Sequence, residues 1–380
     1  MLADQRKWEE IQENEGSLAL SGEEEQILRR IGKPTQTEEN NHTAGLPLYI
    51  NGRAGSGKST MLAYVFAAYW RDALEKLEAG LLEAPPTFRY MALNTRLLDN
   101  ARDTVRGILS EDSLGVADAL EKHGASLGER FTPFRHAMLA MLNSADREKF
   151  LDTENEITFS HFARLLNQQR AVTSTNDKRF EIPIPAVSGF IDVAGAWFVI
   201  RTLLKGNDKI DLDNPVYASI PHRDQRVTEE VFNRVVTQIW PWYRHITAPD
   251  QVFWDDQDLS RAVLTALLNG SNSSFEPVVA LFCDEAQDYT RVELRALMLT
   301  TVFHRYTLQP GDVHLPVVFA GDPLQTINPT GFRVDQIPHM FRQIALEPIG
   351  MQDRVSMGVR ELSNNYRSTD KVVLILNTIN

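Results

Sequence analysis

LPLYINGRAGSGKST, residues 46–60, is the segment of this 380-residue chain from which the fold class can be inferred. Its first residues, Leu46 to Ile50, are apolar and read as a short strand. Gly52 to Ser59 then match the pattern G-x-x-x-x-G-K-[ST], and from Lys58 to about Lys76 the apolar residues recur at helical spacing. The order strand, glycine-rich loop, helix predicts a phosphate-binding loop (P-loop). The alternative is a chance glycine-rich turn, which would not bring a strand and a helix with it.

Each residue type in such a loop has a chemical task. Glycines let backbone N–H groups converge on phosphate oxygens, and the helix N-terminus adds a favourable field. The Lys58 ammonium would reach the β- and γ-phosphates, and the Ser59 hydroxyl would ligate Mg²⁺. We therefore expect ATP, or a close relative, together with Mg²⁺. The nucleotide-binding residues predicted from the loop are Gly52, Gly55, Ser56, Gly57, Lys58, Ser59 and Thr60.

Two later apolar runs end in polar groups that suit phosphate chemistry. PVVALFCDE ends in Asp284 and Glu285, of which the first can hold Mg²⁺ and the second can activate the attacking water. LPVVFAGD is followed by Gln325, which could hydrogen-bond the γ-phosphate or that water. Taken alone, these features would be a strand end meeting solvent and a plain β-turn. Their occurrence with the P-loop favours a catalytic role.

The spacing of these segments predicts the domain organisation. Strands that alternate with helices indicate a parallel α/β sheet, and a continuous apolar run is typical of a strand buried on both faces. The long, mostly helical middle of the chain indicates an inserted subdomain. The boundaries that we predict are 1–45 for a lead-in with an N-terminal helix, 46–110 and 275–350 for the two parts of the sheet domain, 111–274 for the insert, and 351–380 for the start of a second domain.

Composition limits the class of protein. The chain is 43% hydrophobic and 24% charged, with a formal net charge of −12. It is therefore not a general electrostatic binder of nucleic acid, although a local basic groove can lie on an acidic body. One cysteine, Cys283, leaves no internal disulfide, and no secretory signal or membrane-spanning apolar run is visible. We expect a soluble, cytoplasmic protein without a membrane partner, nucleoid-associated if bacterial.

In chain order, the motifs resemble those of the UvrD/Rep-like superfamily 1 helicases. DEAQD (284–288) is similar to their Walker B motif, GDPLQTI (321–327) to motif III and NYRS (365–368) to motif IV. LSGEEEQ (20–26) resembles the Q motif, and TFSHF (158–162) resembles motif Ib with Ser and His exchanged. Asn94-Thr95 is similar to motif Ia. The resemblance implies a RecA-like P-loop sheet with a helical insert, followed by the start of a second RecA-like domain.

The resemblance also implies roles for single residues. Gln26 and Tyr366 would hold the adenine, and Arg367 would act as an arginine finger. Asp284 would support the metal, Glu285 would be the catalytic base and Gln325 would sense the γ-phosphate. The residues that would contact single-stranded nucleic acid are Thr95, Thr158, Phe159 and His161, with Phe332 as the one aromatic that could stack on a base after motif III.

These roles imply an ATPase that moves 3′ to 5′ on single-stranded DNA, with RNA as an open alternative. Two observations favour a second hypothesis: the net charge is acidic, and motif III continues as NPTGF (328–332) instead of several stacking aromatics. As a further departure, motifs V and VI do not occur before Asn380. We therefore also consider a regulatory or sensor NTPase that acts through protein partners in a repair or anti-phage defence complex. A P-loop kinase is a third, more distant option. With half of the inter-domain site missing, we expect residues 1–380 to hydrolyse ATP slowly.

Overall fold

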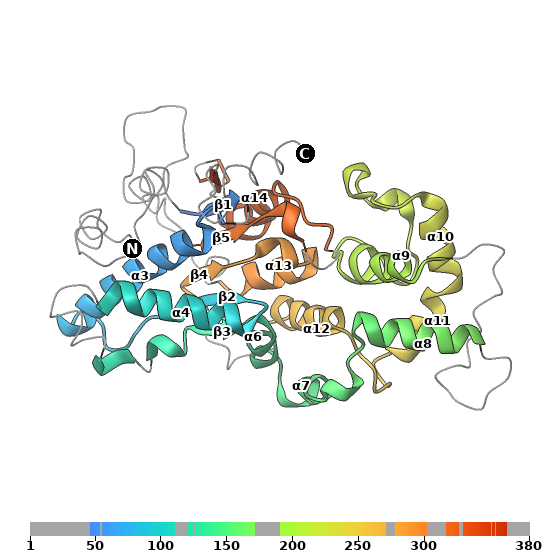
Figure 1. Ribbon diagram of the computed structural model, residues 1–380, viewed down its shortest axis with the longest axis horizontal. Coiled ribbons are helices and arrows are strands. Elements are labelled where there is room, and N and C mark those ends of the chain that lie inside the picture. The colour runs from blue at the N-terminus through green and yellow to red at the C-terminus, as the bar shows by residue number, and fades with distance from the viewer. Residues whose placement is uncertain are drawn as a thin grey trace.

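The computed structural model describes residues 46–362, except 54, 111–120, 125, 172–190, 271–277, 302–316, 327–329, 351 and 354. Gln26, Tyr366 and Arg367, as well as the expected N-terminal helix, lie outside this part of the chain. The described residues form an α/β structure built on one sheet, with a helical region at one end of the long axis (Figure 1).

Within the described residues the sheet has six strands, all parallel, in the order β3-β2-β4-β5-β1-β6. The predicted parallel α/β architecture is confirmed. The strands are β1 (Leu48–Gly52), β2 (Phe88–Ala92), β3 (Phe131–Pro133), β4 (Ala280–Cys283), β5 (Val317–Gly321) and β6 (Gly358–Leu362).

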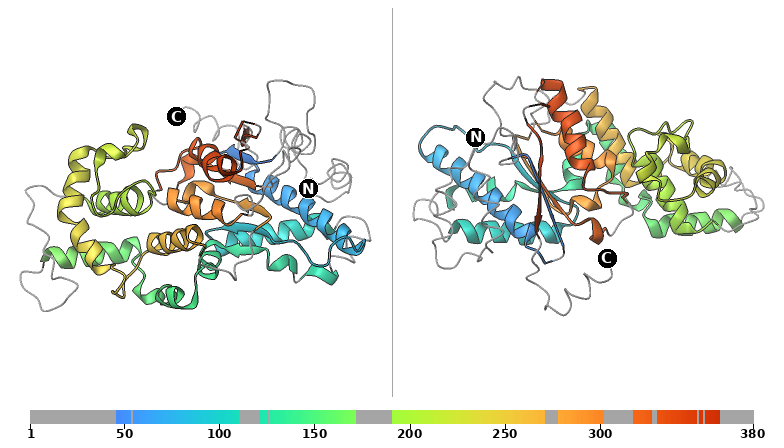
Figure 2. Two further views of the ribbon diagram at one scale, coloured as in Figure 1. Left: turned by 180° about the vertical axis from the view of Figure 1, so that it is seen from behind. Right: turned by 90° about the horizontal axis from the view of Figure 1, so that it is seen from above.

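Helices cover both faces of the sheet, because alternate strand residues point to opposite sides. On β1, Leu48 and Ile50 join one apolar core, and Tyr49 between them joins the other. The right-hand view of Figure 2 shows helices on both sides of the strands. One layer holds α3 (Lys58–Glu78) and α4 (Thr95–Ser110). The other holds α6 (Phe134–Ala140), α12 (Asp256–Leu268), α13 (Arg291–Leu299) and α14 (Gln336–Phe341).

The helical insert has an apolar core of its own, formed between Ile157 and Phe253. The two segments that connect the insert to the sheet domain lie side by side. The Ile157 N–H donates to the Trp254 carbonyl over 2.7 Å, and the Trp254 N–H donates to the Asn155 carbonyl over 3.3 Å. Its helices are α8 (Phe159–Ala171), α9 (Val193–Phe198), the π-helix η3 (Val199–Lys205), α10 (Glu229–Gln238) and α11 (Trp240–Ile246), with 3₁₀ turns η4 (Tyr217–Ser219) and η5 (His222–Asp224).

The predicted boundaries of the insert, 111–274, are therefore too wide. β3 pairs with β2 through Tyr90↔Phe131, and α6 continues directly from it. Helix α12, beyond the insert, packs Leu259 and Val263 into the core beneath the sheet. A strand of three residues has almost no sequence pattern, so its place in the sheet could not be read from local periodicity.

The boundary predicted at residue 351 is also wrong. β6 extends the sheet beside β1, with Leu48 in register with Gly358 and Gly52 in register with Leu362. The first sheet therefore reaches residue 362. The shorter elements of the sheet domain are α7 (Ser144–Leu151), η1 (Thr153–Asn155), η6 (Ala286–Asp288), η8 (Pro323–Gln325), η9 (Arg342–Leu346) and η10 (Glu347–Ile349).

Buried polar groups join the insert to the sheet domain. Lys205, at the end of η3, pairs with Asp255 and Asp258 of the α12 N-terminus, at 2.6 Å in each case. The guanidinium of Arg261 donates to the carbonyls of Leu204 and Lys205 and so caps the end of the π-helix. These contacts fix how the insert packs on the sheet domain, because a buried charge without a partner is costly. Among the described helices, none is both long and apolar enough to cross a membrane.

Candidate active site

Three adjacent strands bring the predicted catalytic segments to one edge of the sheet. β5 lies between β1 and β4, with Asn51 in register with Gly321 and Phe319 in register with Cys283. Because the strands are parallel, the loops that follow them meet at their carboxyl ends, where ligands bind in open α/β sheets. The glycine-rich loop, the turn after Gly321 and the acidic pair after Cys283 are therefore neighbours.

The glycine-rich loop needs glycine at three positions for two different reasons. Gly55 and Gly57 have φ values of 78° and 87°, in the left-handed region that side chains disfavour. Gly52 is needed for space, since a Cβ there would lie 2.3 Å from the Ser56 hydroxyl and 3.0 Å from the Leu362 Cβ. A side chain at any of these positions would force the loop to change shape.

The loop opens directly into the N-terminus of α3, which has no side-chain cap. Its first-turn N–H groups have no acceptor within the helix, so they are available to an anion. Lys58 is 7% exposed, and its ammonium donates to the carbonyls of Gly52 over 2.6 Å and Arg53 over 3.1 Å. The buried hydroxyl of Ser56 has no hydrogen-bond partner among the described residues. The loop thus offers several donors at one point.

Asp284 is a buried carboxylate that faces the glycine-rich loop. It is 2% exposed, and it accepts the Glu285 N–H over 2.9 Å and the Tyr90 hydroxyl over 3.2 Å. Burial and then the charge of Glu285 raise its pKa, while a hydrogen bond from Ser59 acts in the opposite direction. The two residues of the predicted metal pair, Ser59 and Asp284, therefore lie close enough to influence each other.

Glu285 has the one positive φ among the described non-glycine residues, at 51°. This conformation is uncommon for a side-chain-bearing residue and tends to occur at functional sites. Its carboxylate accepts the side-chain amide of Gln287 over 2.7 Å. Sequence analysis did not single out Gln287, although it lies within DEAQD, because the contact depends on the turn.

Gln325 is held within its own turn after β5. Its side-chain amide donates to the Asp322 carboxylate, and its N–H donates to the Asp322 carbonyl over 3.0 Å. Asp322 is 3% exposed and also caps the turn by accepting the Leu324 N–H over 3.0 Å. The described contacts of Gln325 are therefore with Asp322, whereas the acidic residue that interacts with the glycine-rich loop is Asp284.

Four of the five predicted nucleic-acid residues divide between two places, and Phe332 lies apart from both. Thr95 is exposed at the start of α4, where the chain leaves β2. Thr158, Phe159 and His161 lie together at the start of α8 in the insert, with the His161 N–H donating to the Thr158 hydroxyl over 3.4 Å. Phe159 is 47% exposed, so its ring is accessible from solvent.

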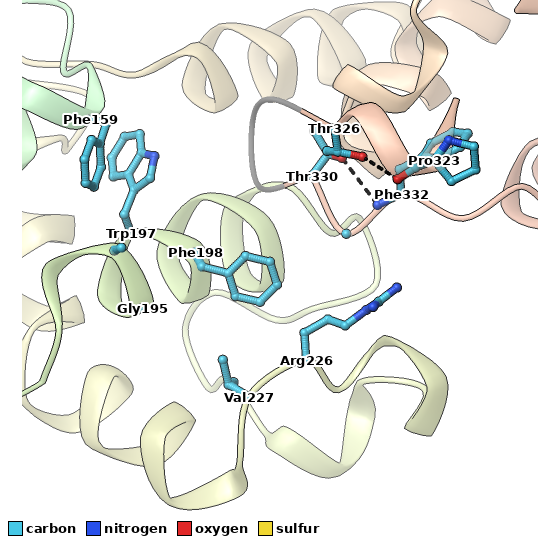
Figure 3. Close-up of a pocket in the computed structure, with 12 residues that line it drawn as sticks. Phe159, Gly195, Trp197, Phe198, Arg226, Val227, Pro323, Thr326, Thr330 and Phe332 are labelled. Atoms are coloured by element: carbon cyan, nitrogen blue, oxygen red, sulfur yellow. Dashed lines mark hydrogen bonds between the residues drawn. The ribbon is translucent and has the colours of Figure 1, made fainter. Parts of the chain in front are cut away.

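A cavity of about 810 Å³ lies between the insert and the loop after β5 (Figure 3). Phe159, Trp197 and Phe198 contribute aromatic rings from the insert, and Arg226 contributes a cation. Pro323, Thr326, Thr330, Gly331 and Phe332 line the opposite wall. Sequence analysis did not identify Trp197 and Phe198. The adjacent aromatic residues in VAGAWF were the feature of the sequence that could have indicated them.

Phe332 does not have the exposure expected of a base-stacking residue. Its side chain is 6% exposed and its ring centroid lies 6.2 Å from that of Tyr49, within the core beneath the sheet. In the structure the ring of Phe332 is therefore largely buried, and its stacking on a base stays a prediction. Phe159, on the opposite wall, is the accessible aromatic.

No family model matches the chain, and no curated protein sequence matches it significantly. The likeness to UvrD/Rep-like helicases therefore rests on the motifs themselves. The site fits Mg²⁺ and a nucleotide on its own chemistry. The unpartnered Ser56 hydroxyl and the uncapped helix suit phosphate oxygens, and the oxygens of Ser59 and Asp284 are the ligand type that Mg²⁺ prefers.

Proposed function

We propose that this chain binds a nucleoside triphosphate with Mg²⁺ and hydrolyses it to the diphosphate and phosphate. The observation that carries the proposal is that Asp284, a buried carboxylate directly after β4, lies at the same edge of the sheet as the glycine-rich loop after β1, where Ser59 opposes the rise in the Asp284 pKa. This arrangement brings together two segments that lie far apart in the sequence and have complementary tasks in phosphoryl transfer. Structural glycine-rich turns have no need of a buried acid beside them.

In the proposed reaction, Lys58 and the first-turn amides of α3 bind the phosphates. Ser59 and Asp284 would hold Mg²⁺, which neutralises phosphate charge when bound. Glu285 accepts a proton from water as the water oxygen forms a bond to the γ-phosphorus. The bond between that phosphorus and the β–γ bridging oxygen breaks, and its electron pair leaves with the diphosphate.

We further propose that single-stranded nucleic acid controls this reaction, as in UvrD-like helicases. The motif order supports this, as does the cavity between insert and sheet domain. Aromatic rings such as Phe159 and a cation such as Arg226 are the groups that stack on bases and neutralise a phosphate backbone. The loop after β5 lines the cavity, and Asp322 at its start is hydrogen-bonded to Gln287, the partner of Glu285. These contacts offer a short route between the two sites.

A sensor NTPase that acts through protein partners is the second candidate. The burial of Phe332 and the net charge of −12 favour it, because both weaken the grip on a strand. The two candidates differ in mechanical work. ATP turnover with and without single-stranded DNA or RNA, followed by a strand-displacement assay, separates them. A motor gives stimulated turnover and displacement, and a sensor gives neither.

A further inference from the structure

The side chain of Gln287 joins the ends of β4 and β5. It is 1% exposed, its Oε1 accepts the Asp322 N–H over 2.9 Å, and its Nε2 donates to Glu285 Oε2 over 2.7 Å. Since a backbone N–H can only donate, the atom that faces Asp322 must be the amide oxygen. The amide nitrogen therefore faces Glu285, and the orientation of the side chain follows from its neighbours.

The backbone around Gln287 is shaped for this contact. A Cβ on Gly321 would lie 2.7 Å from Gln287 Oε1, so a side chain at this position would displace the amide from the end of β5. On the other side, the Thr330 hydroxyl donates to the Gln287 carbonyl over 2.7 Å. Thr330 is 5% exposed and lines the aromatic cavity. Gln287 is thus held by the turn after β5 and by the cavity wall.

Glu285 depends on this neighbour for its orientation. Its left-handed backbone at φ 51° turns the chain so that side chains two residues apart can meet. The Gln287 amide then fixes one carboxylate oxygen, which leaves the other to accept a proton. A free glutamate side chain would sample several rotamers, and a base in the wrong one would not reach the attacking water.

We propose that Gln287 is the positioning residue of the proposed catalytic base, holding the Glu285 carboxylate and linking it to Asp322 and, through its own carbonyl, to Thr330 on the cavity wall. This inference rests on the proposed NTPase function. Gln287 acts through Glu285 and touches no substrate atom. Its loss slows the hydrolytic step and leaves nucleotide binding intact, because Lys58 and the glycine-rich loop keep their contacts.

The substitution Gln287→Glu tests the contact between Gln287 and Glu285 with almost no change in the shape of the side chain. Glutamate at 287 can still accept the Asp322 N–H but can no longer donate to Glu285. We expect the single-turnover hydrolysis rate constant to fall about 10- to 100-fold, the usual effect of losing a partner that orients a reacting group. The dissociation constant for Mg-ATP stays within about threefold of the wild-type value. An unchanged rate constant would overturn the inference.

The exchanged pair Glu285→Gln/Gln287→Glu supplies a readout without nucleotide. In Gln287→Glu two carboxylates face each other, so the melting temperature falls. In the exchanged pair the amide at 285 can donate to the carboxylate at 287, so the melting temperature recovers while hydrolysis stays lost. A melting temperature that does not recover would show that the two side chains do not pair as described.

Gln257→Glu is the matched control. Gln257 is fully buried, its amide donates to Glu293 over 3.0 Å and its oxygen accepts the Thr290 hydroxyl over 2.7 Å, so it repeats the chemistry of Gln287 away from the site. We expect this variant to melt earlier but to hydrolyse ATP at the wild-type rate per folded molecule. Equal rate losses in both variants would contradict the positioning role. If the wild-type chain does not hydrolyse ATP, the proposed function and the catalytic part of this inference both fail, while the melting temperatures still report the contact.

Discussion

Lys205 Nζ lies 2.6 Å from Asp255 Oδ2, and the two side chains are 3% and 0% exposed. Tyr243 donates its hydroxyl to the same oxygen over 2.6 Å. Burial opposes charge on Lys205, but Asp255 and Asp258 outweigh it and raise the lysine pKa. The ion pair fixes the end of the π-helix η3 on the N-terminus of α12, and so fixes the insert on the sheet domain.

Lys205→Met keeps the aliphatic stem and removes the charge. It leaves Asp255 buried without its cation, and breaking a buried pair from one side costs about 3–5 kcal/mol of unfolding free energy. Urea unfolding of both proteins measures the loss. Lys209→Met, an exposed lysine four residues on, is the control and changes stability by less than about 0.5 kcal/mol. A similar, small effect in both variants would contradict the structural role of the pair.

We expect the free energy of unfolding to depend on pH through Glu293, which lies where the insert packs on the sheet domain. Burial raises its pKa to about 7, with Arg201 lowering and Asp256 raising it. This value lies above the 4.5 of an unperturbed glutamate, so between about pH 4.5 and 7 the folded state holds a proton that the unfolded state releases. The contribution of this proton to the free energy of unfolding falls as pH rises through that window.

Glu293→Gln removes this titration and keeps a capping residue for α13. We expect the free energy of unfolding of the variant to change less than that of the wild type between pH 5 and 7.5, by on the order of 2 kcal/mol. Unfolding curves at several pH values test this. The exposed Glu229, changed to Gln, serves as control and keeps the wild-type slope. Parallel curves for wild type and Glu293→Gln would refute the account.

Glu285→Gln separates binding from hydrolysis. The amide cannot take a proton from water, so turnover falls by about 10²–10⁴-fold, the range for loss of a general base. Affinity for Mg-ATP is retained, since the phosphate contacts come from Lys58 and α3. Phosphate release and binding of a fluorescent ATP analogue measure the two effects. Retained hydrolysis would reject Glu285 as the base.

Phe159→Ala tests the aromatic cavity. Stacking contributes about 1–3 kcal/mol per base, so the affinity for a single-stranded oligonucleotide drops about 5- to 150-fold if this ring stacks. Fluorescence anisotropy with labelled DNA and RNA measures the change and the preference between them. Leu81→Ala removes an equally apolar but distant side chain that is 74% exposed, and it leaves affinity unchanged. Equal affinities for all three proteins would exclude the cavity as the nucleic-acid site.

The elements recovered from sequence are those set by local chemistry. The glycine requirements of the loop at Gly55 and Gly57, and the continuous apolar runs of β4 and β5, are visible in single segments. β3 and β6 were missed because their place depends on pairing with distant strands, Tyr90 with Phe131 and Gly52 with Leu362.

The residues of the candidate site likewise divide into those that could be predicted from the sequence and those that could not. Lys58, Ser59, Asp284 and Glu285 could be predicted, because each residue type is tied to its task by a motif. Gln287 could not, since its role comes from a left-handed turn and from the register of β4 beside β5. The burial of Phe332 could not be predicted, because aromatic type in a sequence does not reveal whether the ring is buried.

Nucleotide binding by the glycine-rich loop is the central claim, and titration of the chain with Mg-ATP tests it most directly. We compare wild type with Lys58→Ala and with Lys76→Ala, a lysine of the same helix that pairs with Asp72 instead of the loop. Saturable binding that Lys58→Ala weakens about 10- to 100-fold, as expected for loss of a charge-assisted contact, and that Lys76→Ala preserves is the predicted result. The absence of ATP binding, or equal binding by all three proteins, would contradict the account.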